Sequence, residues 1–369
     1  MTKFDVAIVG AGIAGAGLAA NLARYCSVLL LEGENQPGYH ATGRSAAFWD
    51  ECYGGPNVQP LTTASGPFLL EPPADFHDRP LMTPRGALYI ARANEADLAT
   101  ALQTEFSKSG VKLKRLDGSE LAAHIPGLRS GWTEALWGAS CCDIDVAALH
   151  GAFLRSARRA GAHLQCNAEL LQAGHSSGGW NIETTSGHFE ATTLVNAAGA
   201  WADMVAQRSG IRPLDVQPYR RTIVQLEVDP AVSSDLPLVI GLDGSFYFKP
   251  DSGGRLWLSP HDETATPACD AAPEELDIAI AIDRLQQVVD WRIKRVEHSW
   301  AGLRSFAPDR LPVIGRDLRV PDFFWLAGQG GFGIQTAPAA SRMAASLIAD
   351  AVSMPDGVDA ALYDPKRFG

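Results

Sequence analysis

Three glycines near the start of the chain have the spacing that lets a backbone approach a phosphate. The segment GAGIAG at residues 10–15 follows the pattern G-x-G-x-x-G and stands between an apolar run, Phe4–Val9, and a helical pattern, Ala14–Arg24. The first glycine of such a motif allows a tight turn, the second lets the main chain approach a pyrophosphate, and the third lets helix and strand pack closely. Backbone N–H groups at the helix N-terminus then face the phosphate charge. The residues predicted to contact the pyrophosphate are Gly10, Gly12, Ile13, Ala14 and Gly15.

A second apolar run, Ser27–Leu31, ends in an acidic residue, Glu32. It lies about 20 residues beyond the glycines, where a carboxylate binds the ribose hydroxyls of a dinucleotide. Strand, turn, helix, strand and acid together predict a doubly wound sheet that binds NAD or FAD. The alternative is a sheet of this kind that binds nothing there.

Two further turn-rich segments favour FAD over NAD. Pro37–Ser45 contains Gly43-Arg44-Ser45 and suits a loop folded over a pyrophosphate or an isoalloxazine, although a plain surface turn would have the same composition. The segment GQGGFG at 328–333 follows the apolar run Phe323–Ala327 and precedes a helical pattern, Thr336–Ser353. A helix N-terminus directed at the flavin N1 and C2 carbonyl would stabilise the negative charge of the reduced ring, which a nicotinamide does not need.

The composition is that of a globular enzyme and excludes several kinds of partner. The chain has 369 residues, 46% hydrophobic and 20% charged, and its formal net charge of −11 repels nucleic acid and anionic lipid. Its six cysteines have no metal-ligand spacing, so we expect free thiols and no metal site. The uncharged stretch Val6–Ala23 contains four glycines, and Lys3 is the only basic residue before it. We therefore interpret it as a buried element rather than a signal peptide or a membrane span. We therefore expect a cytoplasmic protein without an integral membrane segment.

Nucleotide-binding patterns occur at the start, the middle and the end of the chain. The run Phe189–Asn196 leads into Ala197–Trp201, a small-residue turn that could lie against a nucleotide. Between these patterns, Arg221–Val228, Ser245–Phe248 and Arg255–Leu258 alternate like strands of a half-exposed antiparallel sheet. We therefore predict an α/β fold in which a Rossmann-like FAD-binding domain is interleaved with a smaller α+β substrate domain on a mainly antiparallel sheet. The predicted ranges are 1–78, 138–200 and 299–369 for the former, and 79–137 and 201–298 for the latter.

These motifs together resemble the D-amino acid oxidase superfamily of FAD enzymes and, within it, the bacterial D-arginine dehydrogenases. The resemblance is carried by GAGIAG (10–15), QPGYHATGRSAA (36–47), DIDVAALH (143–150), VNAAGAW (195–201), SFYFKPD (245–251), WAGLRSF (300–306) and QGGFGIQT (329–336). It implies non-covalent FAD and an amino acid substrate whose Cα gives a hydride to flavin N5. The resulting imino acid is hydrolysed to a keto acid and ammonia. We expect oxygen or a quinone as electron acceptor, and a monomer or homodimer.

The resemblance also implies which residues bind the substrate. Arg221 and Arg304 would clamp its carboxylate, with the hydroxyls of Tyr53 and Tyr247 in support. A guanidinium can hold a carboxylate through two parallel hydrogen bonds, which fixes orientation as well as charge. Because neighbours on a strand face opposite sides, only one of Arg220 and Arg221 can point into the site. The remaining predicted contacts with FAD or substrate are Gly43, Arg44, Ser45, Ala46, Ala198, Gly199, Trp201, Gly330, Gly331, Phe332, Gly333, Ile334 and Gln335.

Two departures from the D-arginine dehydrogenases bear on the substrate. This chain has Phe48 where they have a histidine near the flavin, and Ala87 where they have an acid for the substrate guanidinium. Phe48 and Trp49 could line an apolar pocket instead. Asp50 would either retain a preference for cationic substrates or be a solvated loop acid. We therefore predict oxidative deamination of D-amino acids with apolar side chains. The alternatives are oxidation of secondary amines or 2-hydroxy acids, and a protein that holds FAD for structure alone.

Overall fold

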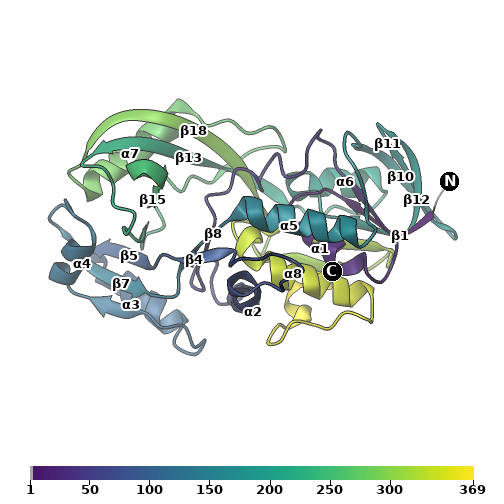
Figure 1. Ribbon diagram of the computed structural model, residues 1–369, viewed down its shortest axis with the longest axis horizontal. Coiled ribbons are helices and arrows are strands. Elements are labelled where there is room, and N and C mark those ends of the chain that lie inside the picture. The colour runs from purple at the N-terminus through teal and green to yellow at the C-terminus, as the bar shows by residue number, and fades with distance from the viewer. Residues whose placement is uncertain (1–2) are drawn as a thin grey trace.

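The computed structural model describes residues 3–369, which form two sheet-based regions side by side along the long axis of the molecule (Figure 1). One region contains an eight-stranded sheet and the other a nine-stranded sheet. A small three-stranded sheet includes β4 and β8, which lie near the middle of the view. The chain passes between the regions several times, as the interleaved sequence patterns predict.

The eight-stranded sheet has a parallel centre in the order β9-β2-β1-β12-β20. The strands β10, β11 and β19 are added in antiparallel orientation. The strands are β1 (Lys3–Val9), β2 (Val28–Leu31), β9 (His163–Gln165), β10 (Leu170–Ser176), β11 (Gly179–Thr184), β12 (Gly187–Asn196), β19 (Val313–Arg316) and β20 (Phe323–Ala327).

Both faces of this sheet are covered, so its central strands are apolar throughout. On β1, Val6 and Ile8 pack into one hydrophobic cluster while Ala7 and Val9 pack into another on the opposite face. The helices on the first face are α1 (Ile13–Leu22), α5 (Val146–Arg159) and α8 (Gly333–Ile348); α6 (Ala202–Arg208) lies on the second.

The nine-stranded sheet is antiparallel except for the pairing of β5 with β14, which agrees with the predicted half-exposed sheet. Its strands are β5 (Ala87–Arg92), β6 (Lys114–Leu116), β7 (Trp132–Gly138), β13 (Gln217–Asp229), β14 (Leu238–Gly241), β15 (Tyr247–Asp251), β16 (Arg255–Ser259), β17 (Thr264–Ala265) and β18 (Arg292–Phe306). The helices of this region are α3 (Ala96–Glu105), α4 (Gly118–His124) and α7 (Glu275–Val288). The small sheet contains β3 (Phe48–Trp49), β4 (Met82–Pro84) and β8 (Cys142–Ile144), with α2 (Gln59–Leu70) between β3 and β4 in sequence.

The predicted boundary between residues 298 and 299 falls within a continuous strand, β18, which pairs with β13 along most of its length. The two-domain division stays a proposal. Within residues 3–369, no helix combines the length and the apolar character needed to cross a bilayer.

The tightest backbone packing of the eight-stranded region lies at the third glycine of the first motif. A Cβ atom at Gly15 would lie 1.9 Å from the carbonyl oxygen of Gly10. We therefore expect Gly15→Ala to lower the free energy of unfolding by about 3 kcal/mol, because α1 must move away from the turn. Chemical denaturation measures this change. The matched control is Gly174→Ala on β10, where an added Cβ meets no atom within 4 Å. A change in Gly15→Ala no larger than in the control would contradict the close packing.

Candidate active site

Residues from both large sheets line one cleft. Its empty volume, including the part that is open to solvent, is about 1260 Å³. The predicted residues that line it are Gly10, Gly12, Ile13, Ala14, Glu32, Arg44, Ser45, Ala46, Ala198, Gly199, Trp201, Arg221, Tyr247, Arg304, Gly330, Gly331, Gly333 and Ile334. The fold thus brings the predicted nucleotide segments and the predicted arginines to one place. Gly15, Gly43, Phe332 and the remaining predicted substrate residues lie outside the lining.

The first glycine turn packs directly on the turn that follows β12. Gly10 has a φ of +101°, and a Cβ there would lie 2.5 Å from the carbonyl oxygen of Ala197. The N–H of Ile13 donates to Thr42 Oγ1 at 3.0 Å, which ties the start of α1 to the loop that contains Arg44. These close backbone approaches leave room for a pyrophosphate only because side chains are missing from the turn. The residues present therefore fit the predicted dinucleotide.

Glu32 lies at the end of β2, as the motif predicts, and is partly buried. Its carboxylate accepts the N–H groups of Ala11, at 3.0 Å, and Glu34, at 3.1 Å. Burial raises the pKa of Glu32 above its ordinary value. The carboxylate therefore holds the glycine turn through the N–H of Ala11, and Glu32 also lines the cleft.

The loop with Arg44 is more than a surface turn. The guanidinium of Arg44 donates to the carbonyl oxygens of Ala271, at 2.7 Å, and Ala301, at 3.1 Å, and pairs with Asp270. Trp300 Nε1 donates to the carbonyl oxygen of Arg44 at 3.0 Å. These bonds attach the loop to the nine-stranded region, so the loop covers one wall of the cleft.

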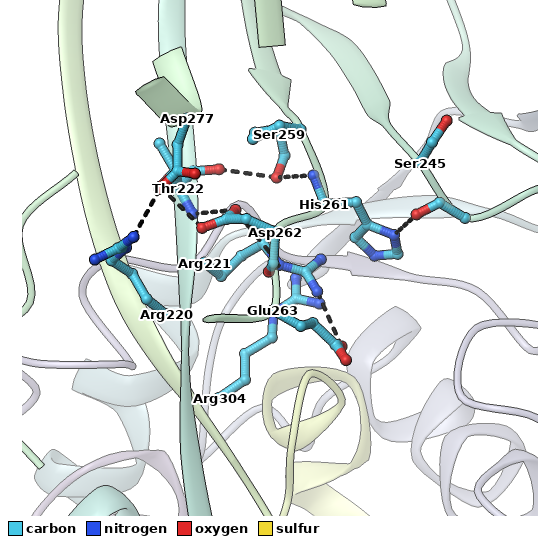
Figure 2. Close-up of polar contacts among 12 residues, drawn as sticks. Arg220, Arg221, Thr222, Ser245, Ser259, His261, Asp262, Glu263, Asp277 and Arg304 are labelled. Atoms are coloured by element: carbon cyan, nitrogen blue, oxygen red, sulfur yellow. Dashed lines mark hydrogen bonds and ion pairs between the residues drawn. The ribbon is translucent and has the colours of Figure 1, made fainter. Parts of the chain in front are cut away.

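Strand pairing places the two predicted clamp arginines on one face. In the β13–β18 register Arg221 lies opposite Gly302, and Arg304 lies opposite Tyr219, two residues along each strand. Arg220 points to the other side, where it pairs with Asp277 at 2.9 Å (Figure 2). The alternation expected along a strand therefore selects Arg221 for the cleft.

Arg221 is 3% exposed and is already bonded on one side. Its Nε donates to the carbonyl oxygen of Asp262 at 2.7 Å, and its Nη2 pairs with Glu263 at 3.1 Å (Figure 2). Its Nη1 is buried without a partner among the described residues. Burial, together with the charge of Arg304, lowers the pKa of Arg221 to about 10. One donor of this buried cation therefore has no partner within the described chain.

The positive charge of Arg304 has fewer partners among the described residues than that of Arg221. Its Nη1 donates to the hydroxyl oxygen of Tyr53 at 2.6 Å, and within residues 3–369 no carboxylate oxygen lies within 4.0 Å of its guanidinium. A Cβ at Gly331 would lie 2.8 Å from the same Nη1, so this glycine makes room for the guanidinium. Two guanidinium groups thus meet in one cleft with few acids beside them.

Aromatic rings surround this pair. Tyr247 is 2% exposed, and its ring packs edge-on against that of Phe48, with centroids 6.0 Å apart. Phe48 in turn contacts Tyr53 at 4.9 Å between centroids. His261, which the sequence did not single out, lies beside both tyrosines.

The other residues predicted for the substrate pocket lie behind the cleft. Trp49 Nε1 donates to the carbonyl oxygen of Thr62 at 2.8 Å, and Ala87 is fully buried in β5. The amide of Gln335 donates to the carbonyl oxygen of Tyr53 at 2.9 Å and accepts the N–H of Asp50 at 3.2 Å. Gln335 therefore holds the segment with Tyr53 in place and is not part of the cleft lining.

Asp50 is neither a solvated loop acid nor part of the cleft lining. It is 5% exposed, and its carboxylate accepts the hydroxyl of Tyr89 at 2.8 Å and the N–H of Cys52 at 2.9 Å. Burial raises its pKa from 3.8 to about 6. The carboxylate fixes the turn that leads to Tyr53.

Sequence reasoning singled out most segments of the cleft wall but not every residue in them. The lining residues that were not predicted individually are Gly38, Tyr39, His40, Ala41, Thr42, Ala197, Ala200, Ile223, Gly302, Leu303, Ser305 and Gln329. All but Ile223 lie within the segments Pro37–Ser45, Ala197–Trp201, 300–306 and 328–333, which the sequence analysis names. Gln329 is of chemical interest, since its Nε2 is buried without a partner among the described residues.

The buried carboxylate of Asp50 predicts a pH effect on stability. Between about pH 4 and pH 6 the Asp50 carboxyl group is mostly protonated in the folded protein and mostly ionised in the unfolded chain. Its contribution to the free energy of unfolding of the wild type therefore decreases as the pH rises. Asp50→Asn removes this loss. The free energy of unfolding of the variant minus that of the wild type should therefore increase by about 2 kcal/mol across this range. Urea denaturation at several pH values measures it, and a difference that does not change with pH would contradict the assignment.

Comparisons with known proteins agree with the fold. Glycine oxidase of Geobacillus kaustophilus is 27% identical over 361 residues, covering 94% of this chain and 93% of that one, and its crystal structure superposes with a TM-score of 0.85. L-Proline dehydrogenase of P. horikoshii has a TM-score of 0.86 at 23% identity, covering 99% and 98% of the two chains. Human mitochondrial dimethylglycine dehydrogenase is 25% identical over 61% of this chain and 28% of its own. Residues 5–347 match the DAO family, described as FAD dependent oxidoreductase, and the chain therefore belongs to the DAO family of FAD-dependent oxidoreductases.

Proposed function

We propose that this protein oxidises the Cα–N bond of D-amino acids with apolar side chains, giving an imino acid that hydrolyses to a keto acid and ammonia. Membership of the DAO family supports FAD-dependent oxidation of an amine or amino acid. The D configuration is part of the proposal because of the resemblance to the D-arginine dehydrogenases. The preference for apolar side chains rests on the residues of the cleft.

The uncompensated charge of Arg304 is the observation that carries this proposal. Arg304 is half-buried, and a partly desolvated cation without a counter-ion is costly, so the site favours an anionic ligand. Arg221 lines the same cleft, and its buried Nη1 has no partner among the described residues. An α-carboxylate satisfies both guanidinium groups at once, and two such bonds fix the position of the adjoining Cα.

The charges elsewhere in the cleft argue against a cationic side chain on the substrate. Within the described chain, Glu32 is the only carboxylate among the lining residues, and it lies beside the glycine turn rather than near Arg304. Tyr247 lines the cleft and packs against Phe48, which in turn packs against Tyr53, so the protein next to the lining is aromatic here. An apolar substrate side chain gains from burial there, whereas a cationic one finds no counter-ion.

The residues that would hold FAD are those of the glycine motifs and the loop around Arg44. Gly10, Gly12 and the start of α1 would hold the pyrophosphate, and Glu32 would bind the ribose hydroxyls. The start of α8, from Gly333, would bring its N–H groups to the flavin. When bound, the flavin accepts the hydride released from Cα. The chain itself supplies position and charge, because the arginine clamp decides which C–H bond is presented.

Similarity to dimethylglycine dehydrogenase favours a second candidate, the oxidation of secondary or tertiary amines of the N-alkyl amino acid type. Such substrates carry the same carboxylate and would use the same clamp. They differ from D-amino acids at the nitrogen, so substrate profiling separates the two candidates.

We expect anaerobic D-Leu, D-Met or D-Phe to bleach the oxidised flavin absorption of the purified protein, and D-Arg to do so poorly. Stopped-flow absorbance with a panel of D- and L-amino acids, sarcosine, dimethylglycine and 2-hydroxy acids measures this. Reduction by sarcosine or dimethylglycine alone would replace the first candidate by the second. A flavin that no member of the panel reduces would indicate that FAD has a structural role only.

The clamp itself predicts the effect of removing one guanidinium. Arg304→Leu should lower kcat/KM by a factor corresponding to about 3 to 5 kcal/mol while FAD stays bound, because the substrate carboxylate loses its partner. The matched control is Arg295→Leu, on the same strand but exposed, which should leave kcat/KM unchanged. Steady-state kinetics and flavin content measure both variants. An unchanged kcat/KM in Arg304→Leu would remove this residue from the clamp.

A further inference from the structure

We infer that His261 is a positioning residue for the clamp: it accepts the hydroxyl proton of Tyr53 and thereby fixes Tyr53 as the hydrogen-bond acceptor of Arg304. This inference rests on the proposed function, because it concerns how the carboxylate-binding guanidinium is held. His261 belongs to no motif of the sequence analysis and is not among the residues that line the cleft.

The backbone of His261 is held in an unusual conformation. The residue has a φ of +54°, a region that side chains other than glycine rarely adopt. Its N–H donates to Ser259 Oγ at 3.1 Å, and that hydroxyl donates to the carbonyl oxygen of Thr222 at 2.8 Å (Figure 2). Ser259 is fully buried, so β13 and β16 together determine where the histidine ring lies. Backbone strain of this kind is found at functional sites.

The hydrogen bonds of the ring determine which nitrogen carries the proton. Nδ1 lies 2.5 Å from the carbonyl oxygen of Gly244, which can only accept, so Nδ1 carries the hydrogen. In the neutral ring Nε2 is then an acceptor, and it lies 3.2 Å from the hydroxyl oxygen of Tyr53. The Tyr53 hydroxyl therefore donates to His261.

This donation fixes the role of Tyr53 toward Arg304. A phenol has one proton, so a hydroxyl that donates to His261 presents only lone pairs in other directions. Arg304 Nη1 donates to one of them at 2.6 Å. The order Arg304 to Tyr53 to His261 to Gly244 is thus a continuous chain in which every donor meets an acceptor.

Packing holds the two rings in this order. Tyr247 contacts His261 edge-on, with centroids 5.6 Å apart and an angle of 86°. Phe332 contacts Tyr53 in the same manner at 5.6 Å and 72°. Without an acceptor at position 261, the Tyr53 hydroxyl could rotate its proton toward the guanidinium, where donor would face donor. Arg304 would then lose its only hydrogen-bond partner among the described side chains.

The test uses the FAD-loaded protein and two substitutions that separate the ring nitrogens. His261→Asn retains a donor near Nδ1 and tolerates the positive φ, but does not reach Tyr53. His261→Gln places an amide oxygen near Nε2. We expect KM for the best amino acid, and Kd for benzoate as a non-oxidisable carboxylate, to rise about tenfold in His261→Asn, with kcat changed by no more than about twofold. His261→Gln should restore most of the affinity. Flavin absorbance measures both constants.

A double-mutant cycle tests whether the effect passes through Tyr53. In a Tyr53→Phe background, His261→Asn should change KM and Kd by less than about twofold, because no hydroxyl is left to orient. An equal loss in both backgrounds would overturn the inference, as would an unchanged affinity in His261→Asn. Should His261→Asn not fold, a tenfold weaker His261→Gln would overturn it as well.

The exposed residue His298 on β18 supplies the matched control. It stacks on Trp300 away from the clamp, and His298→Asn should leave both constants unchanged. Failure of the proposed function has a different outcome: the wild type itself would then bind no benzoate and be reduced by no amino acid.

Discussion

The pairing of β13 with β18 is the constraint on which the candidate site depends. These strands are distant in sequence, and their register places Arg221 and Arg304 diagonally on one face. A slip by one residue would send either side chain to the opposite face, where Arg220 now pairs with Asp277. The register irregularities of this pair lie beyond residue 225, between Gln225 and Leu226 and between Glu227 and Val228, so the end that carries the arginines pairs regularly.

Charge compensation at the clamp is unequal, and this inequality suits a site that must bind and release an anion. Arg221 has permanent partners in Glu263 and the backbone of Asp262, so its position is set before any ligand arrives. Arg304 depends on the neutral hydroxyl of Tyr53. Under the proposed function, an incoming carboxylate gains most from Arg304, while Arg221 supplies orientation. Because the Arg304 guanidinium has no carboxylate partner within residues 3–369, under the proposed function a bound anion reduces an existing electrostatic cost there rather than displacing an internal ion pair.

The sequence predicted much of the fold, since its periodic patterns are local. The run Phe323–Ala327 coincides with β20, and β1, β2, β12, β16 and α1 begin and end within a few residues of their predicted patterns. The long strand β18 has no clear alternation and was missed, although the motif WAGLRSF within it was recognised. Roles that depend on tertiary contacts could not be predicted. Asp50 and Gln335 read as pocket residues, yet their hydrogen bonds hold the Tyr53 segment from behind, and the contact of His261 with Tyr53 joins residues far apart in sequence.

The loop around Arg44 and the two arginines of the proposed clamp are connected through the strand β18. Gly302 on β18 lies opposite Arg221, and a Cβ there would lie 3.3 Å from the Cβ of Arg44. Arg44 in turn donates to the carbonyl oxygen of Ala301, and Trp300 donates back to Arg44. The strand that carries Arg304 therefore also contacts the loop on the nucleotide side of the cleft. All of these contacts involve residues 300–302 of β18, so a single strand links Arg304 to the loop on the nucleotide side of the cleft.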